Sequence, residues 1–456
     1  MKGAVAEMTH NALTDKYLDE AAQYGIQPNE LVELALRPEV KLGPTTFLGR
    51  CLSRPVFLEY DQREQLAADL ENLHAALTGL PDRLFGGDLA AFARAVGMTD
   101  AQVTAIMRGA GDAPTRFARA DFYPDGTGFR LMEINMGSTA GGGDNAVLTR
   151  AFLDHPFLAE FVAANRLAHV DTMAEVADSL LTECKVPSGM RPLVAAADWP
   201  ASYEKLEPTL RYSAEQLAPF GIDMVPCHIG QLSVGDGRVW VHGRPVDVIY
   251  RVFMIEDLLD PVGPQLIDPI LRAAERGEVS IFTPIDAELY GSKGALAMLS
   301  DEANRHLYGA AELASLDRIL PWTRMVRPGA VTVAGEQVDL PEYATAEQHE
   351  LILKPTLLHA GMGVVPGWMV DADEWRRQVN AAMDGPFVLQ RRIRPVPEQF
   401  PSEQGLQPWV LTWGAFLAAS GYAGQFVRGT TEPDGGVVNM ATGATATSCF
   451  HQTEAG

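Results

Sequence analysis

Four polar residues lie close together in the segment "RADFYPDGTGFRLMEIN", which runs from Arg119 to Asn135. Asp121, Glu133 and Asn135 supply carboxylate and amide oxygens, the hard donors that Mg²⁺ prefers while it keeps water or phosphate oxygens in its remaining positions. Arg119 adds a planar guanidinium that can hold two oxygens of a phosphate or a carboxylate. The residues therefore fit a magnesium and phosphate site, and they also fit the plain polar face of a solvent-facing hairpin.

The same segment has the pattern of a β-hairpin that would bring these side chains together. Residues alternate in character on either side of the turn "PDGTG". Because side chains two apart on a strand point to one face, Glu133 and Asn135 share a face, and Arg119 shares the face of Asp121. Three consecutive glycines follow at 141–143, where the missing side chains permit close approach of a substrate.

Further cationic residues lie near predicted strand ends in the second half of the chain. Lys354 ends the apolar strand "ILKP", Lys293 begins the predicted helix "SKGALAMLSDEANRHL", and Arg428 lies in "YAGQFVRGTT". A buried lysine in an acidic protein favours a bound anion, whereas a surface lysine is the more common case. After Arg428, the turn "TEPDGG" predicts that "GGVVN" returns as an antiparallel strand and brings Asn439 beside the arginine.

The remaining patterns predict a mixed α/β fold, with an α+β arrangement in the second half. The apolar spacing of residues 63–80 predicts a helix, and "RPLVAAADW" predicts a buried strand followed by a helix. Short strands are expected at "RPVDVIYRVF", "GEVSIFTP", "GPFVLQRRI" and "PWVLTWGAFLA". We expect a mainly helical N-terminal region at 1–114, a mixed α/β region at 115–265 that carries the hairpin and substrate-binding elements, and a nucleotide-binding region at 266–456.

Composition narrows the class of partner. The chain has 456 residues, is 47% hydrophobic, and carries a net charge of −23, so we expect no nucleic-acid partner. Its four cysteines are far apart, no apolar run is long enough to span a membrane, and the N-terminus lacks the apolar core of a signal peptide. We therefore expect a cytoplasmic protein without a membrane partner, and the sequence makes no prediction of its oligomeric state. The motifs of P-loop, zinc hydrolase and serine hydrolase enzymes are all missing.

The ordered combination of these segments resembles the circularly permuted ATP-grasp enzymes, and among them glutathionylspermidine synthase and related carboxylate–amine ligases. The resemblance rests on the Arg119–Asn135 segment, "VDVIYRV", "FTPIDAELYGSKGALAML", "LILKP", "FVLQRRI" and "GYAGQFVRGTTEPDGGVVN". In ordinary ATP-grasp proteins the nucleotide-binding lysines precede the metal carboxylates. Here the carboxylates come first, as in the permuted branch. The resemblance implies a circularly permuted ATP-grasp fold that follows a mainly helical N-terminal region.

The resemblance also implies a role for each polar residue. ATP and Mg²⁺ would be the cofactors, and the substrates would be an amine and a small-molecule or peptide carboxylate. By resemblance, Asp121, Glu133 and Asn135 would hold two magnesium ions, Lys293 and Lys354 would contact the ATP phosphates, Gln390 would border the adenine, Arg119 and Arg428 would handle the transferred phosphate, and Ser138 would contact the carboxylate substrate.

Two features depart from the family pattern. Leu357, Leu358 and His359 separate the second lysine from the glycines that often follow it directly, and the first 110 residues match no motif of the family. The expected reaction is attack of a carboxylate on the γ-phosphate of ATP, followed by displacement of phosphate by the amine. A small-molecule kinase and a non-catalytic nucleotide-binding protein are the alternatives.

Overall fold

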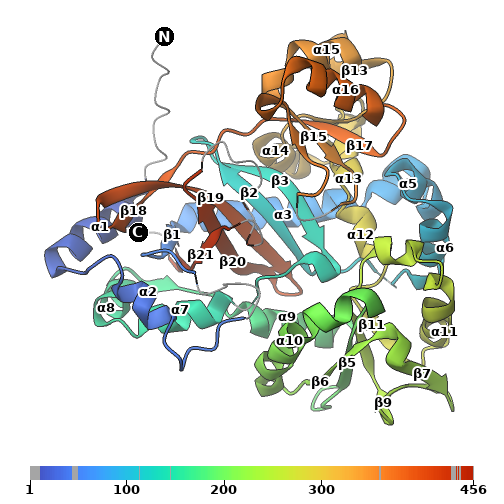
Figure 1. The fold of residues 1–456 in the computed structure, drawn as a ribbon, viewed down its shortest axis with the longest axis horizontal. Coiled ribbons are helices and arrows are strands. Elements are labelled where there is room, and N and C mark those ends of the chain that lie inside the picture. The colour runs from blue at the N-terminus through green and yellow to red at the C-terminus, as the bar shows by residue number, and fades with distance from the viewer. Residues whose placement is uncertain are drawn as a thin grey trace.

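The computed structural model describes residues 11–43, 50–111, 113–143, 145–358, 361–432, 438, 440 and 443–454. His359 and Asn439 lie outside these described residues. Figure 1 shows a central sheet with a parallel sheet below it and a third, smaller sheet above it in the orange part of the chain. Within the described ranges, every helix is too short or too polar to cross a membrane.

The central sheet joins segments that are far apart in the chain. Its strand order is β21-β20-β19-β2-β3, and β18 also pairs with β19. The hairpin predicted at residues 119–135 is confirmed as β2 and β3. The bounds of these strands are Ala118–Pro124 (β2), Phe129–Met136 (β3), Glu398–Ser402 (β18), Gly405–Ala418 (β19), Gly421–Thr430 (β20) and Thr445–Thr447 (β21).

One predicted pairing in this sheet is wrong. The strand that returns beside β20 is β21, so Ala446 lies opposite Arg428 in place of a residue of "GGVVN". Arg428 Nε donates to the Val438 backbone carbonyl oxygen at 3.2 Å. The chain turns further along, at Gly443, whose φ of +107° is a conformation that glycine adopts readily.

The parallel sheet has the strand order β11-β10-β5-β6. All six residues of β5 are buried, which confirms the buried strand predicted at "RPLVAAADW" and the helix after it. A small antiparallel sheet, β7-β8-β9, adjoins it. The bounds are Leu193–Asp198 (β5), Asp223–His228 (β6), Leu232–Gly235 (β7), Arg238–Val241 (β8), Arg244–Val246 (β9), Val248–Arg251 (β10), Ser280–Phe282 (β11), Thr172–Glu183 (α9), Pro200–Leu217 (α10) and Gly263–Glu275 (α11).

The third sheet, β12-β17-β15-β16, carries Lys354 and Gln390. Helix α13 begins at Lys293 as predicted, but it ends at Ser300 and not beyond, because the Asp301 side chain caps a separate 3₁₀ turn, η5 (Glu302–Leu307). The bounds are Lys293–Ser300 (α13), Ala310–Ile319 (α14), Thr323–Met325 (β12), Ala330–Val333 (β13), Glu336–Asp339 (β14), Leu340–Ala346 (α15), Leu351–Pro355 (β15), Val365–Pro366 (β16), Ala372–Ala382 (α16) and Phe387–Arg391 (β17).

Helices surround these sheets. The helix predicted at 63–80 is α3, which begins with a capping box and buries leucines spaced three and four residues apart against the other elements. The remaining bounds are Ala12–Tyr24 (α1), Glu30–Ala35 (α2), Val56–Leu58 (β1), Tyr60–Thr78 (α3), Leu80–Phe85 (α4), Leu89–Ala95 (α5), Asp100–Gly109 (α6), Asn145–Leu153 (α7), Pro156–Ala164 (α8), Leu167–Ala168 (β4), Ala287–Tyr290 (α12) and Cys449–Gln452 (β22).

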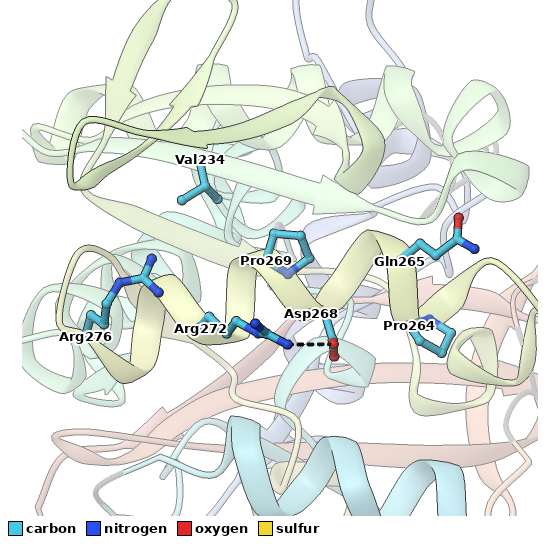
Figure 2. Close-up of a pocket in the computed structure, with 7 residues that line it drawn as sticks. All are labelled: Val234, Pro264, Gln265, Asp268, Pro269, Arg272 and Arg276. Atoms are coloured by element: carbon cyan, nitrogen blue, oxygen red, sulfur yellow. Dashed lines mark ion pairs between the residues drawn. The ribbon is translucent and has the colours of Figure 1, made fainter.

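An open groove runs along α11 on the surface of the parallel-sheet region. Figure 2 shows Val234 of β7 pointing toward Pro269 of the helix, with the Asp268–Arg272 ion pair beside it. The Oδ2 to Nη2 distance of that pair is 3.6 Å, and its arginine is well exposed. We assign this solvent-facing groove no role.

Candidate functional site

The polar residues of the β2–β3 hairpin gather on one face of the central sheet. In the register, Asp121 lies opposite Glu133, and Arg119 lies opposite Asn135. A β-bulge follows directly between Asp121 and Phe122 and shifts the pairing by one residue. The prediction that these four side chains share a face is confirmed.

Asp121 is the centre of this face and is only 1% exposed. Its Oδ1 accepts from Arg119 Nε at 2.9 Å, and its Oδ2 accepts from Arg428 Nη2 at 2.9 Å. Burial alone would raise the pKa of Asp121, but the two adjacent guanidinium groups hold it well below its usual value. The carboxylate is therefore ionised, and it is bound between two arginines that are far apart in the chain.

Gly414 makes room for the cluster that Asp121 forms with Arg119 and Arg428. The sequence did not indicate this role. Gly414 lies opposite Asp121 in the neighbouring strand β19. A Cβ atom at this position would come within 2.8 Å of Arg119 Cδ and 2.9 Å of both Asp121 Oδ1 and the Phe426 carbonyl oxygen. A glycine inside a predicted strand is the signal that could have indicated such a close approach.

Gly414→Ala is expected to lower the free energy of unfolding by about 1–3 kcal/mol, because the added methyl group overpacks the cluster. Chemical denaturation measures this change. Gly235→Ala is the matched control, since a Cβ there would meet nothing within 4 Å. Equal stability of the two variants would mean that the arginine cluster adjusts without cost.

Lys293 links the hairpin to the third sheet. Its Nζ lies 3.1 Å from Glu133 Oε2 and also donates to the Leu358 carbonyl oxygen at 3.2 Å. Its position is fixed by the start of α13, where the Ser292 side chain accepts from the Gly294 N–H. Burial alone would raise the pKa of Glu133, but the charges of Lys293 and Lys354 lower it. Glu133 is therefore an anion beside two lysines.

Lys354 is buried between the hairpin and β17. Its Nζ donates to Gln390 Oε1 at 2.7 Å and to the Met132 carbonyl oxygen at 3.2 Å. Burial lowers its pKa from 10.5 to about 8; Glu133 opposes this shift and Lys293 adds to it. The Gln390 amide in turn donates to Thr323 Oγ1 at 3.2 Å. Lys354 is thus a buried lysine whose charged form is disfavoured by burial and favoured by Glu133.

The low pKa of Lys354 predicts a pH-dependent difference in stability. Between pH 8 and pH 10 the unfolded state, with a lysine pKa of about 10.4, holds the proton that the folded state has lost, so stability rises with pH in this window. Lys354→Met removes this contribution. The stability of the wild type relative to the variant is expected to increase by up to about 3 kcal/mol from pH 7 to pH 10.4. Denaturation of both proteins across this range measures it, and a constant difference would contradict the lowered pKa.

Ser138 stands apart from these contacts. Its Oγ lies 3.8 Å from the Sδ atom of Met254, which follows strand β10 of the parallel sheet. Phe426 is a second residue of the site that the sequence did not indicate. Its ring lies under the guanidinium groups of Arg119 and Arg428, whose Cζ atoms are 5.9 Å and 5.5 Å from the ring centroid.

The oxygen donors on this face are of the chemical type that Mg²⁺ prefers. Asp121, Glu133 and the Asn135 amide are hard donors on one sheet face. Within the described ranges, no group of three or more His, Cys, Asp or Glu residues has a metal-binding arrangement. A magnesium site on this face would therefore need the Asn135 amide as well as the two carboxylates. To bind a metal ion, Asp121 would have to lose hydrogen bonds from Arg119 or Arg428.

Some solved structures of other proteins are similar to this chain. No protein-family model and no curated protein matches this sequence. A glutathione synthetase-like effector from Globodera pallida is similar with a TM-score of 0.55 and 14% identity, over 87% of this chain and 89% of that chain. A putative γ-glutamylcysteine synthetase from Methylobacillus flagellatus aligns with a TM-score of 0.44 and 12% identity, over 82% and 86% of the two chains. The first likeness shows that the chain has the fold of this effector over most of its length.

Proposed function

We propose that the protein is an ATP-dependent carboxylate–amine ligase of the circularly permuted ATP-grasp type. The observation that carries the proposal is the convergence of Asp121, Glu133, Lys293, Lys354 and Arg428, which come from four distant segments, at the junction of the central and third sheets. Two lysines and two arginines face two carboxylates there, which is a suitable arrangement for a polyphosphate and a metal ion. The fold likeness to a glutathione synthetase-like protein agrees with this class.

In the proposed reaction a substrate carboxylate oxygen attacks the γ-phosphorus of ATP, and the bond to the ADP oxygen breaks. The amine nitrogen then attacks the resulting acyl phosphate, inorganic phosphate leaves, and the nitrogen loses a proton as the amide forms. Negative charge accumulates around the transferred group, so cationic side chains that are already in position lower the barrier. The protein needs no nucleophilic side chain of its own.

The lysines and Gln390 bind the nucleotide in this proposal. Lys293 and Lys354 hold the phosphates, and Gln390, which already orients Lys354, borders the adenine. Asp121, Glu133 and Asn135 hold magnesium, which when bound would neutralise phosphate charge. Arg119 and Arg428 bind the transferred phosphate, because planar guanidinium groups can hold two of its oxygens. Ser138 contacts the carboxylate substrate.

Burial makes Cys51, Cys184 and Cys227 poor candidates for a covalent nucleophile. Burial raises the pKa of the Cys51 and Cys227 thiols to about 12, so both are protonated at neutral pH. A protonated, buried thiol is a poor nucleophile. Cys184 has a pKa of about 12 for the same reason, to which the charge of Glu183 adds.

Turnover of ATP with a panel of carboxylates and hydroxylamine tests the proposal. We expect ADP, phosphate and a hydroxamate in equal amounts, identified by mass spectrometry, and loss of all three products in Lys293→Met. AMP and pyrophosphate as the stoichiometric products would contradict the mechanism. Transfer of phosphate to a hydroxyl substrate without any amine would favour a kinase, and ATP binding without turnover of any pair would favour a nucleotide-binding protein.

A further inference from the structure

The turn between helices α5 and α6 lies against the two segments that carry Lys293 and Lys354. Val96 and Gly97 belong to this turn, and Val96 is completely buried. The turn is part of the first 110 residues, in which the sequence shows no motif of the ATP-grasp family. Its contacts therefore place this part of the chain beside the candidate site.

Val96 packs against the first turn of α13. A Cβ atom on Gly294 would come within 3.1 Å of Val96 Cα and 3.2 Å of Val96 Cβ, so a larger residue at either backbone would have little room. Gly294 directly follows Lys293, whose backbone N–H donates to the Thr356 carbonyl oxygen at 2.9 Å. The α5–α6 turn thus contacts the point at which the helix that carries Lys293 begins.

Gly97 packs against the segment that follows Lys354. A Cβ atom on Gly97 would overlap Pro386 Cβ and come within 3.1 Å of Thr356 Oγ1. The Thr356 N–H donates to the Pro386 carbonyl oxygen at 2.8 Å, and the Thr356 carbonyl oxygen accepts from Lys293. Thr356 lies two residues after Lys354, directly after the end of β15. Moving Thr356 would therefore change the spacing of the two lysines.

Two features hold Pro386 in place against the α5–α6 turn. The proline ring fixes its own backbone φ, and the carbonyl oxygen of the preceding Gly385 accepts from Arg327 Nη1 at 2.6 Å. Gly97 has a φ of +100°, a conformation that glycine adopts without strain. Gly97→Ala would therefore strain the turn and also force it apart from the third sheet.

We propose that Gly97 is a positioning residue, whose missing side chain lets the α5–α6 turn set the spacing of Lys293 and Lys354 for the phosphates of one nucleotide. Gly97 itself does not contact the nucleotide in this proposal. The inference rests on the proposed function, since the spacing matters only if both lysines bind the same polyphosphate. It gives the N-terminal part of the chain a role in nucleotide binding.

Gly97→Ala tests the proposal, and Gly25→Ala is its matched control. Gly25 also has a positive φ, of +88°, but a Cβ atom there would meet nothing within 4 Å. Both variants place alanine in a left-handed conformation, and only Gly97→Ala also displaces Pro386. In calorimetric titration, Gly97→Ala is expected to raise the dissociation constant of ATP at least about tenfold, the scale of one hydrogen bond to a charged group. Gly25→Ala should leave it unchanged.

A second substitution should reverse the effect. Pro386→Gly removes the Cβ atom that the added methyl group would overlap, so the double variant is expected to bind ATP with nearly the affinity of Pro386→Gly alone. A general loss of stability would not be reversed in this way, because a proline-to-glycine change in itself favours the unfolded chain. If Gly97→Ala does not fold, Gly294→Ala pushes on Val96 from the side of α13 and should also weaken ATP binding, in a helix that tolerates alanine.

Hydrogen exchange without nucleotide separates this proposal from the proposed function. The backbone N–H groups of Lys293 and Thr356 are expected to exchange faster in Gly97→Ala than in the wild type or Gly25→Ala, because their acceptors move. Unchanged exchange, or faster exchange in a variant that binds ATP as tightly as Gly25→Ala, would overturn the proposal and leave the ligase assignment intact. A wild type that binds no ATP would overturn both.

Discussion

Asp121→Asn is expected to lower the free energy of unfolding by about 3–5 kcal/mol, because it removes one partner of a buried charge cluster and leaves two guanidinium groups without the carboxylate that binds both. Arg428 is 8% exposed and Arg119 is 9% exposed, so water can solvate neither well. The asparagine keeps the size of the side chain. The loss therefore measures charge pairing and not packing. Urea denaturation monitored by circular dichroism gives the value.

Asp317→Asn is the matched control for this measurement. Asp317 also binds an arginine with both oxygens, but its side chain is 55% exposed. Exposed pairs contribute about 0–1 kcal/mol. The lowered pKa of Asp121 means that its stabilisation is fully present above about pH 5 and is lost as the pH falls further. The effect of Asp121→Asn should therefore be constant from pH 5 to pH 9. If Asp121→Asn lowers the free energy of unfolding no more than Asp317→Asn does, the cost of burying the charges of Asp121, Arg119 and Arg428 cancels their attraction.

The hairpin could be predicted from sequence because its signals are local. Alternation along β2 and β3 and the glycine-containing turn between them fix which residues face each other. The start of α13 at Lys293 was likewise predictable from neighbouring residues, since Ser292 is a typical N-cap.

Pairing between distant segments could not be predicted in this way. Asp121 and Gly414 are neighbours in the sheet, yet almost three hundred residues separate them, and an alternating strand pattern does not name its partner strand. The hydrogen bonds between Arg428 and Asp121 follow from that pairing. The wrong partner for β20 has the same origin, because the turn at "TEPDGG" indicates that the chain reverses and not where the next strand begins.

A local sequence pattern also cannot decide whether Asp121 and Glu133 bind magnesium. The sequence placed the oxygen donors on one face, but it could not show that Arg119 and Arg428 bind Asp121 from both sides. Glu133 differs from Asp121, since its side chain is 28% exposed and its ion pair is with one lysine. Of the two carboxylates, Glu133 is thus the more accessible to a metal ion, and it is the better position at which to test the proposed chemistry.

Glu133→Gln is expected to reduce ADP formation by about a hundredfold or more at saturating magnesium, the scale on which one preorganised electrostatic contact acts in catalysis. The amide keeps the shape of the side chain and can still accept from Lys293, so folding should be intact. Removing a negative charge beside Lys293 and Lys354 should leave binding of metal-free ATP unchanged or make it tighter. If Glu133 had only a structural role, Glu133→Gln would not lower ADP formation while leaving ATP binding intact.

The measurement pairs a coupled assay of ADP release with calorimetric titration of ATP in the presence of a chelator. Glu207→Gln provides the control, because Glu207 pairs with Arg211 on the surface of α10, and its loss should change neither quantity. Near-normal turnover of Glu133→Gln at high magnesium would return the hairpin face to a structural role. Weaker binding of metal-free ATP would mean instead that Glu133 acts by positioning the lysines beside it, of which Lys293 lies 3.1 Å from its carboxylate.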